Sequence, residues 1–115
     1  MYEIMEVQDI SRPRCKRFVA HIKAHMADVD SIKAVISDAT EKLKLADQYS
    51  NEATKQRFGN APAHVIRLYV YYSGKLVCQS MWADNTLKDV PLPKPLDYND
   101  YVDDIGIMFI GRQNK

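Results

Sequence analysis

The hydrophobic positions between Arg14 and Phe58 follow the spacing of an amphipathic helix. This stretch contains neither glycine nor proline. Apolar or small residues recur in it at alternating intervals of three and four, the a/d pattern of a helix that buries one stripe of its surface. The large side chains of this stripe form a predicted helical interface of Ile22, Val29, Ile32, Ile36 and Leu43.

The pattern is compatible with one long helix or with two consecutive helices. Ser11 and Pro13 have the residue types of an N-cap and a first helical turn, so helix is expected from Pro13 onward. A single helix of roughly 40 residues would extend about 60 Å and would need a partner to cover its stripe. Residues 28–31 are rich in N-cap residue types, and the compactness of small domains favours a break there.

Both ends of the chain have the composition of β-strands. Residues 2–10 contain many β-formers and predict a first strand, with Ile4, Met5 and Val7 as its core contacts. Residues 105–111 are apolar at nearly every position, which is typical of a short strand buried on both faces.

A β-hairpin is predicted in the middle of the chain. Two β-rich runs flank Ser73-Gly74, which has the residue types of a two-residue hairpin turn. The regular register of such a turn would gather five side chains on one face of the hairpin. They are Arg67, Tyr69, Tyr71, Cys78 and Trp82.

These elements predict a single α+β domain over residues 1–115. Between the hairpin and the last strand, residues 90–96 place a proline at every second position, which suits an extended crossing and excludes a central strand. We therefore expect a small, mainly antiparallel sheet, made of the N-terminal strand, the central hairpin and the C-terminal strand. It would pack against one long or two consecutive helices.

The net charge and the two cysteines restrict the classes of function that this protein can have. The net charge of +1 is far below that of a dedicated nucleic-acid binder, so any such contact must come from local placement of cations. The N-terminal residues lack the pattern of a signal peptide, and no apolar run is long enough to span a bilayer. Cys15 and Cys78 are isolated, which favours two buried thiols in a cytoplasmic protein without membrane contact.

No motif for catalysis or for metal binding is complete. His21 and His25 have the spacing of a metal pair, but a glutamate between them and a third ligand are missing. The acidic run 97–104 lacks the glycine and the distal glutamate of an EF-hand loop, with Val102 and Met108 at those positions. We therefore assign no catalytic, cofactor-binding or metal-binding residue and expect no cofactor.

A cluster of cations lies at the expected start of the helix. Residues 11–18 include Arg12, Arg14, Lys16 and Arg17, although the N-terminal end of a helix disfavours positive side chains. One interpretation is that they bind an anion, either a phosphate of a nucleic acid or the carboxylates of a partner. The alternative is that they pair with acidic residues of the first strand.

The face of the hairpin described above would extend this anion site. Arg67, Tyr69, Tyr71 and Trp82 would add stacking surfaces to it. The alternative is that this face is buried under the helices.

The expected function is that of a small non-catalytic cytoplasmic interaction module. It would self-associate or dock on a larger protein through its helical interface, with an anion or nucleic acid as an additional contact at the helix N-terminus. One alternative is a small inhibitor or immunity-type protein that presents the acidic run 97–104 to a basic target.

A second alternative comes from the order of elements. A strand, two helices and three strands are similar to the arrangement of small ribonuclease toxins of the RelE type. The C-terminal Arg112, Gln113 and Lys115 are loosely similar to the basic end of those toxins.

Overall fold

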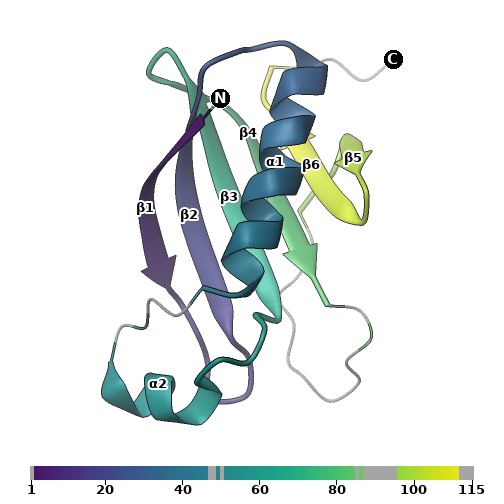
Figure 1. Ribbon diagram of the computed structural model, residues 1–115. Helices are drawn as coiled ribbons and strands as arrows, with labels where there is room; N and C mark the ends of the chain where they lie inside the picture. The colour runs from purple at the N-terminus through teal and green to yellow at the C-terminus, as the bar shows by residue number, and fades with distance from the viewer. Residues whose placement is uncertain (1, 47–48, 50, 85, 87–95, 112–115) are drawn as a thin grey trace.

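The protein folds as a six-stranded sheet with two helices packed against it (Figure 1). The computed structural model describes residues 2–46, 49, 51–84, 86 and 96–111. The strands are β1 (Tyr2–Asp9), β2 (Arg17–Ala24), β3 (Val65–Tyr72), β4 (Lys75–Ala83), β5 (Asp100–Val102) and β6 (Ile105–Phe109). The helices are α1 (Val29–Lys44) and α2 (Glu52–Phe58). The α+β prediction is confirmed, but the sheet has more strands than predicted.

The strand order across the sheet is β1-β2-β3-β4-β6-β5. Strands β2 and β3 pair in parallel, and both helices lie in the connection between them, because parallel neighbours need a long crossover. The four other pairings are antiparallel, so the prediction of a mainly antiparallel sheet is confirmed.

The prediction that helix begins at Pro13 is wrong, because residues 17–24 form strand β2. Phe18, Ala20, Ile22 and Ala24 alternate along this strand and are all buried. Positions four apart, such as Phe18 and Ile22, share a face in a strand as well as in a helix. The apparent helical spacing in this region was therefore the even spacing of a buried strand face.

The connection between β1 and β2 is a tight turn. The Arg12 N–H donates to the Cys15 carbonyl (2.9 Å), and the Cys15 N–H donates to the Arg12 carbonyl (3.0 Å). Pro13 follows Arg12 at the corner, a position that suits its fixed φ. The Ser11 hydroxyl accepts the Arg17 N–H (3.0 Å) across the hairpin, so Ser11 does not cap a helix.

The first helix begins where the sequence predicted a break. Asp28 is the N-cap of α1, and its carboxylate accepts the Ser31 N–H (3.0 Å). The apolar side of α1 covers one face of the sheet, mainly over β3 (Figure 1). Ile32 and Ile36 are at most 1% exposed, whereas Val29 is 41% exposed.

Most of the predicted helical interface is therefore packed inside the chain itself. Ile32, Ile36 and Leu43 belong to the same buried cluster as Ile22, which comes from β2 and not from a helix. In the described residues this stripe is covered by the chain's own sheet.

The predicted hairpin is confirmed, but its register differs from the regular one. Ser73 (φ 51°) and Gly74 (φ 79°) form the turn with positive φ at both positions, as a type I′ turn requires. The register shifts by one residue between Val70 and Tyr71. A one-residue shift moves every later side chain to the opposite face, so Trp82 lies opposite Ile66 on the face under α1.

Strand β1 contributes less to the core than predicted. Ile4 is 39% exposed and Met5 is 52% exposed, because β1 is the edge strand of the sheet and its register shifts at Met5. Only Val7 of the three expected contacts packs against the core. The predicted crossing at 90–96 falls, except for Leu96, outside the described residues, as do Arg112, Gln113 and Lys115.

Candidate interaction surface on the open face of the sheet

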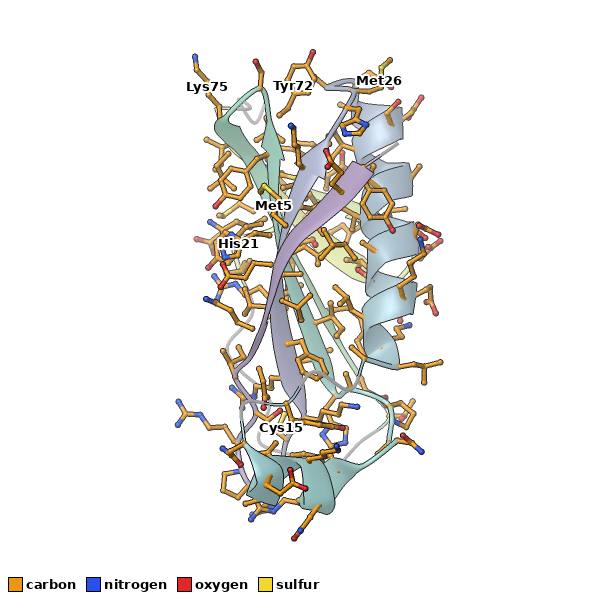
Figure 2. The ribbon with its side chains drawn as sticks, turned by 60° about the vertical axis from the view of Figure 1, so that its left-hand side comes forward. Met5, Cys15, His21, Met26, Tyr72 and Lys75 are labelled. Carbon is orange, nitrogen blue, oxygen red and sulfur yellow. The ribbon has the colours of Figure 1, made fainter. Side chains whose placement is uncertain are left out.

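The sheet face opposite α1 carries no helix in the described part of the chain. Figure 2 shows the sheet close to edge-on, with α1 on one side and His21 on the other. We call this second side the open face. Its outward residues on β2, β3, β4 and β6 follow from the strand registers. They are Arg17, Val19, His21, Lys23, Val65, Arg67, Tyr69, Tyr71, Leu76, Gln79, Met81, Ala83, Gly106 and Met108.

One end of the open face is partly covered by the chain itself. Leu96 and Tyr98 pack against a small buried cluster that includes Val65 and Met81. Tyr98 lies directly over Gly106, where a Cβ atom would come within 2.5 Å of its ring. This burial raises the pKa of the Tyr98 hydroxyl. Among the described residues, this cover is limited to the end of the open face around Tyr98, and the candidate surface is the part beyond it.

Three aromatic rings stand together on this remaining surface. His21 is stacked on Tyr69 (centroids 5.2 Å apart, 13° between planes) and on Tyr71 (5.8 Å, 25°). The His21 Nδ1 and the Tyr71 hydroxyl are also within hydrogen-bond distance at 3.1 Å. His21 thus covers one face of Tyr69 and one face of Tyr71, and the three rings fix each other's orientation.

Arg67 lies beside these rings and is only half-buried. Its Nη2 donates to Gln79 Oε1 (3.1 Å), and its Cζ lies 5.4 Å from the centre of the Tyr69 ring. Its Nε is buried and has no hydrogen-bond partner. No described carboxylate forms an ion pair with Arg67. The guanidinium is thus held in one orientation without a counter-ion among the described residues.

The part of the open face formed by β2, β3, β4 and β6 is positively charged. Its outward residues on β2, β3, β4 and β6 include the cations Arg17, Lys23 and Arg67 and no carboxylate. Among the described residues, β1 adds carboxylates to this face: Glu6 lies opposite His21, and Glu3 lies opposite Lys23, with which it pairs (3.9 Å). Both of those side chains are more than half exposed, so this pair contributes little to stability.

The cations of the predicted anion site do not meet at a helix N-terminus. Arg12 and Arg14 are exposed near the tip of the β1–β2 turn, and Arg17 begins β2. Lys16 is fully buried, where its Nζ donates to the Ala61 carbonyl and lies over the ring of Tyr49. Lys16 therefore holds the chain around α2 and cannot contact an external anion.

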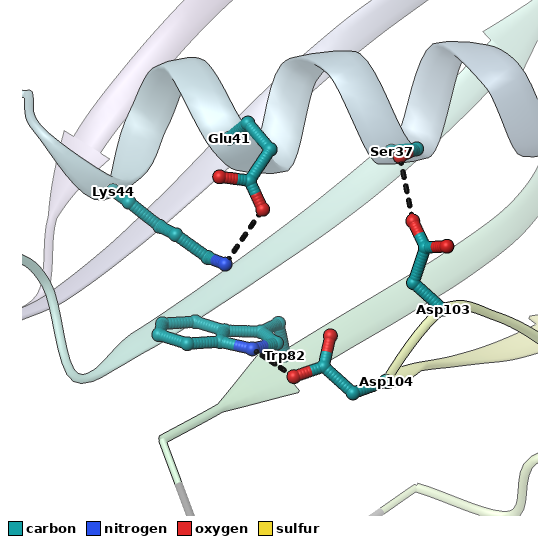
Figure 3. Close-up of polar contacts among 6 residues, drawn as sticks. All are labelled: Ser37, Glu41, Lys44, Trp82, Asp103 and Asp104. Atoms are coloured by element: carbon teal, nitrogen blue, oxygen red, sulfur yellow. Dashed lines mark hydrogen bonds and ion pairs between the residues drawn. The ribbon is translucent and has the colours of Figure 1, made fainter.

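Trp82 is also unavailable to a partner, because it takes part in a polar cluster under α1 (Figure 3). The Lys44 Nζ lies 4.1 Å from the centre of its ring, and the Trp82 Nε1 donates to Asp104 (3.0 Å). In the same cluster the Ser37 hydroxyl donates to Asp103 (2.8 Å).

The acidic run 97–104 is therefore largely bonded within the chain. Besides Asp103 and Asp104, Asp100 forms an ion pair with Lys33 at 2.9 Å. These contacts leave few carboxylates in this segment for a basic target.

Neither the two histidines nor the acidic run gathers a set of metal ligands in the part of the chain that the structure describes. Within the described ranges no group of three histidine, cysteine or carboxylate side chains could hold a metal ion. His21 contacts tyrosines, and His25 lies 3.1 Å from Glu3.

Comparison with known proteins gives no relative. No known protein family, curated protein or solved structure matches this chain. Among the described helices, none has both the length and the apolar composition needed to cross a membrane.

The sequence indicated the residues of β3 on the open face and did not indicate the neighbouring His21 of β2. Arg67, Tyr69 and Tyr71 were expected on one face, and the structure places them together. His21 was missed as their neighbour because residues 17–24 were interpreted as a helix. The polar Arg17, His21 and Lys23 at odd positions, with four buried apolar residues at the even positions of the same segment, are the signal that a strand interpretation would have found.

Proposed function

We propose that this protein is a small non-catalytic interaction module that docks on a larger protein through the open face of its sheet. The observation that carries the proposal is the group of His21, Tyr69, Tyr71 and Arg67, which lies on a sheet face that no described helix covers. Tyrosine and arginine are enriched at the centres of protein interfaces and supply much of their binding energy.

The rigidity of this group supports the proposal. Each ring is held by a neighbour, and Arg67 is held by Gln79 and Tyr69. Side chains that are already ordered lose less conformational entropy when a partner binds. Docking is favoured over self-association by charge. Two copies of the central strands would bring cations against cations, and the Glu3 and Glu6 carboxylates of β1 already contact Lys23, His25 and Gln8.

A second candidate is the binding of single-stranded nucleic acid. It is favoured by the combination of three cations with three rings on one sheet face, since grooves of this composition bind such strands. Stacking of bases would however require ring faces, and here His21 already covers one face of Tyr69 and one face of Tyr71.

The proposal can be tested with two tyrosines of the same strand. Tyr69 lies on the open face, whereas Tyr72 lies at the end of β3 and is 38% exposed. Tagged wild-type protein, Tyr69→Ala and Tyr72→Ala are used to isolate bound proteins from the native host. We expect one stoichiometric protein that is lost with Tyr69→Ala and retained with Tyr72→Ala. Equal retention by both variants would contradict the proposal.

A further inference from the structure

Arg67 combines two features that are unfavourable in the isolated chain. Its guanidinium is half-buried beside Val19 and Met81, which are 8% and 5% exposed, and no described carboxylate compensates its charge. Its Nε is in addition a buried donor without an acceptor. A half-buried cation without a counter-ion and a buried donor without a partner both lower stability. An anion arriving from outside would offset part of this cost.

We propose that Arg67 is an anion-binding subsite that receives a carboxylate from an acidic segment of the docking partner. This inference rests on the proposed function and adds the chemical class of the partner. The guanidinium is prepared for this contact, because Gln79 fixes one of its nitrogens and the Tyr69 ring lies beside it. A planar guanidinium in a fixed orientation can bind the two oxygens of a carboxylate in parallel.

The charges around the subsite select an acidic partner over a second copy of the chain. The outward residues of β2, β3, β4 and β6 carry cations and no carboxylate. Among its described residues, a second copy could offer from the same face only Glu3 and Glu6 of β1, which already contact Lys23, His25 and Gln8. On the α1 side, Asp100, Asp103 and Asp104 are already bonded to Lys33, Ser37 and Trp82. A partner protein with an acidic segment would bring carboxylates that have no such bonds.

The rings of the face favour a protein over a nucleic acid. His21 covers one face of Tyr69 and one face of Tyr71, and the Arg67 guanidinium lies over the Tyr69 ring. Fewer ring faces therefore remain for stacking with bases, whereas the tyrosine hydroxyl groups can donate hydrogen bonds to carboxylates.

The test measures binding of two labelled probes by fluorescence anisotropy. The first is a fluorescein-labelled decapeptide of glutamate, and the second is a labelled deoxythymidine decamer. Both are titrated with wild-type protein, Arg67→Met, Arg67→Lys and Lys75→Met, and the fold of each variant is checked by circular dichroism. Lys75 is the matched control, because it is an exposed cation at the β3–β4 turn (Figure 2).

The inference predicts that the glutamate peptide binds the wild-type protein and that Arg67→Met weakens this binding about tenfold or more. Arg67→Lys should give an intermediate affinity, because it keeps the charge and loses the planar fork. Lys75→Met should change the affinity by less than about twofold. Arg67→Lys keeps the positive charge and a side chain of similar size, so we expect it to fold. It therefore still tests the subsite if Arg67→Met does not fold.

Three results would overturn the inference. They are absence of peptide binding to the wild-type protein, equal losses at Arg67 and Lys75, and tighter binding of the deoxythymidine probe than of the peptide. If the peptide fails while Tyr69→Ala still loses its partner protein, the open face remains the docking surface and only the carboxylate subsite is wrong.

Discussion

Replacing Ile36 by alanine should destabilise the isolated chain strongly, whereas Val29→Ala should have little effect. Both residues belong to the stripe that the sequence indicated as a helical interface. In the structure Ile36 is completely buried between α1 and the sheet, and Val29 is 41% exposed in the first turn of α1. The two substitutions therefore distinguish between two roles of this stripe: packing in the chain's own core, or binding to another chain.

The magnitude follows from the groups removed at Ile36. The substitution deletes three buried carbon groups at about 0.8 kcal/mol each, and the cavity left behind adds to this loss. We expect a fall of about 3 to 4 kcal/mol in the free energy of unfolding for Ile36→Ala, and less than about 1 kcal/mol for Val29→Ala. For 115 residues the unfolding entropy is about 240 cal/mol/K, so Ile36→Ala should lower Tm by about 12 to 17 °C.

Thermal and urea unfolding, followed by circular dichroism at several protein concentrations, measure these differences. The unfolding midpoint should not depend on protein concentration, because the stripe is covered within one chain. Two results would refute the reasoning: similar losses for the two variants, or a midpoint of the wild-type protein that rises with concentration.

Three further predictions concern pH, packing and thiol chemistry. Burial lowers the pKa of His64 below its ordinary 6.5, and its Nδ1 accepts the Lys16 N–H (2.9 Å). The unfolded state then binds more protons, so the free energy of unfolding should fall as pH drops below about 6.5, and His64→Gln should reduce this dependence in urea titrations. Gly106→Ala should lower the unfolding free energy by about 1 to 3 kcal/mol because its Cβ would meet the Tyr98 ring, and a Tyr98→Ala background should remove most of that loss. Burial raises the pKa of the Cys78 thiol to about 12, so a thiol reagent should label it only when the protein unfolds; rapid labelling of the folded protein would contradict this burial.

Local signals in the sequence were sufficient for some elements of the fold. The Ser73-Gly74 turn was predicted because a two-residue turn with positive φ has few alternatives. The start of α1 was indicated by N-cap residue types, and Asp28 is its cap. In both cases the deciding interactions lie within a few residues of one another.

The segment around Ser11 and Pro13 was misinterpreted because its residue types suit both the start of a helix and a turn between two strands. Pro13 suits the first turn of a helix and equally the corner of a β-turn, because both need the same φ. Ser11 can cap a helix, but its hydroxyl instead accepts the Arg17 N–H across the hairpin. The parallel pairing of β2 with β3 joins segments far apart in the chain, and local spacing carries no information about it.

The open face was predictable only in part for a similar reason. Arg67, Tyr69 and Tyr71 alternate along one strand, so their common side follows from the period of a strand. The place of Trp82 depended on the register shift at Val70, for which we found no local signal. His21 joined the face through the unrecognised strand β2.

Site-specific photo-crosslinking tests the central claim most directly, because it reports contact without requiring a purified partner. Benzoylphenylalanine is placed in the native host at position 69 in place of Tyr69, or at position 72 in place of Tyr72, and the cells are irradiated. The account predicts a discrete crosslinked protein from position 69 and none from position 72. Crosslinking from position 72 alone, or from neither position, would contradict a docking surface on the open face.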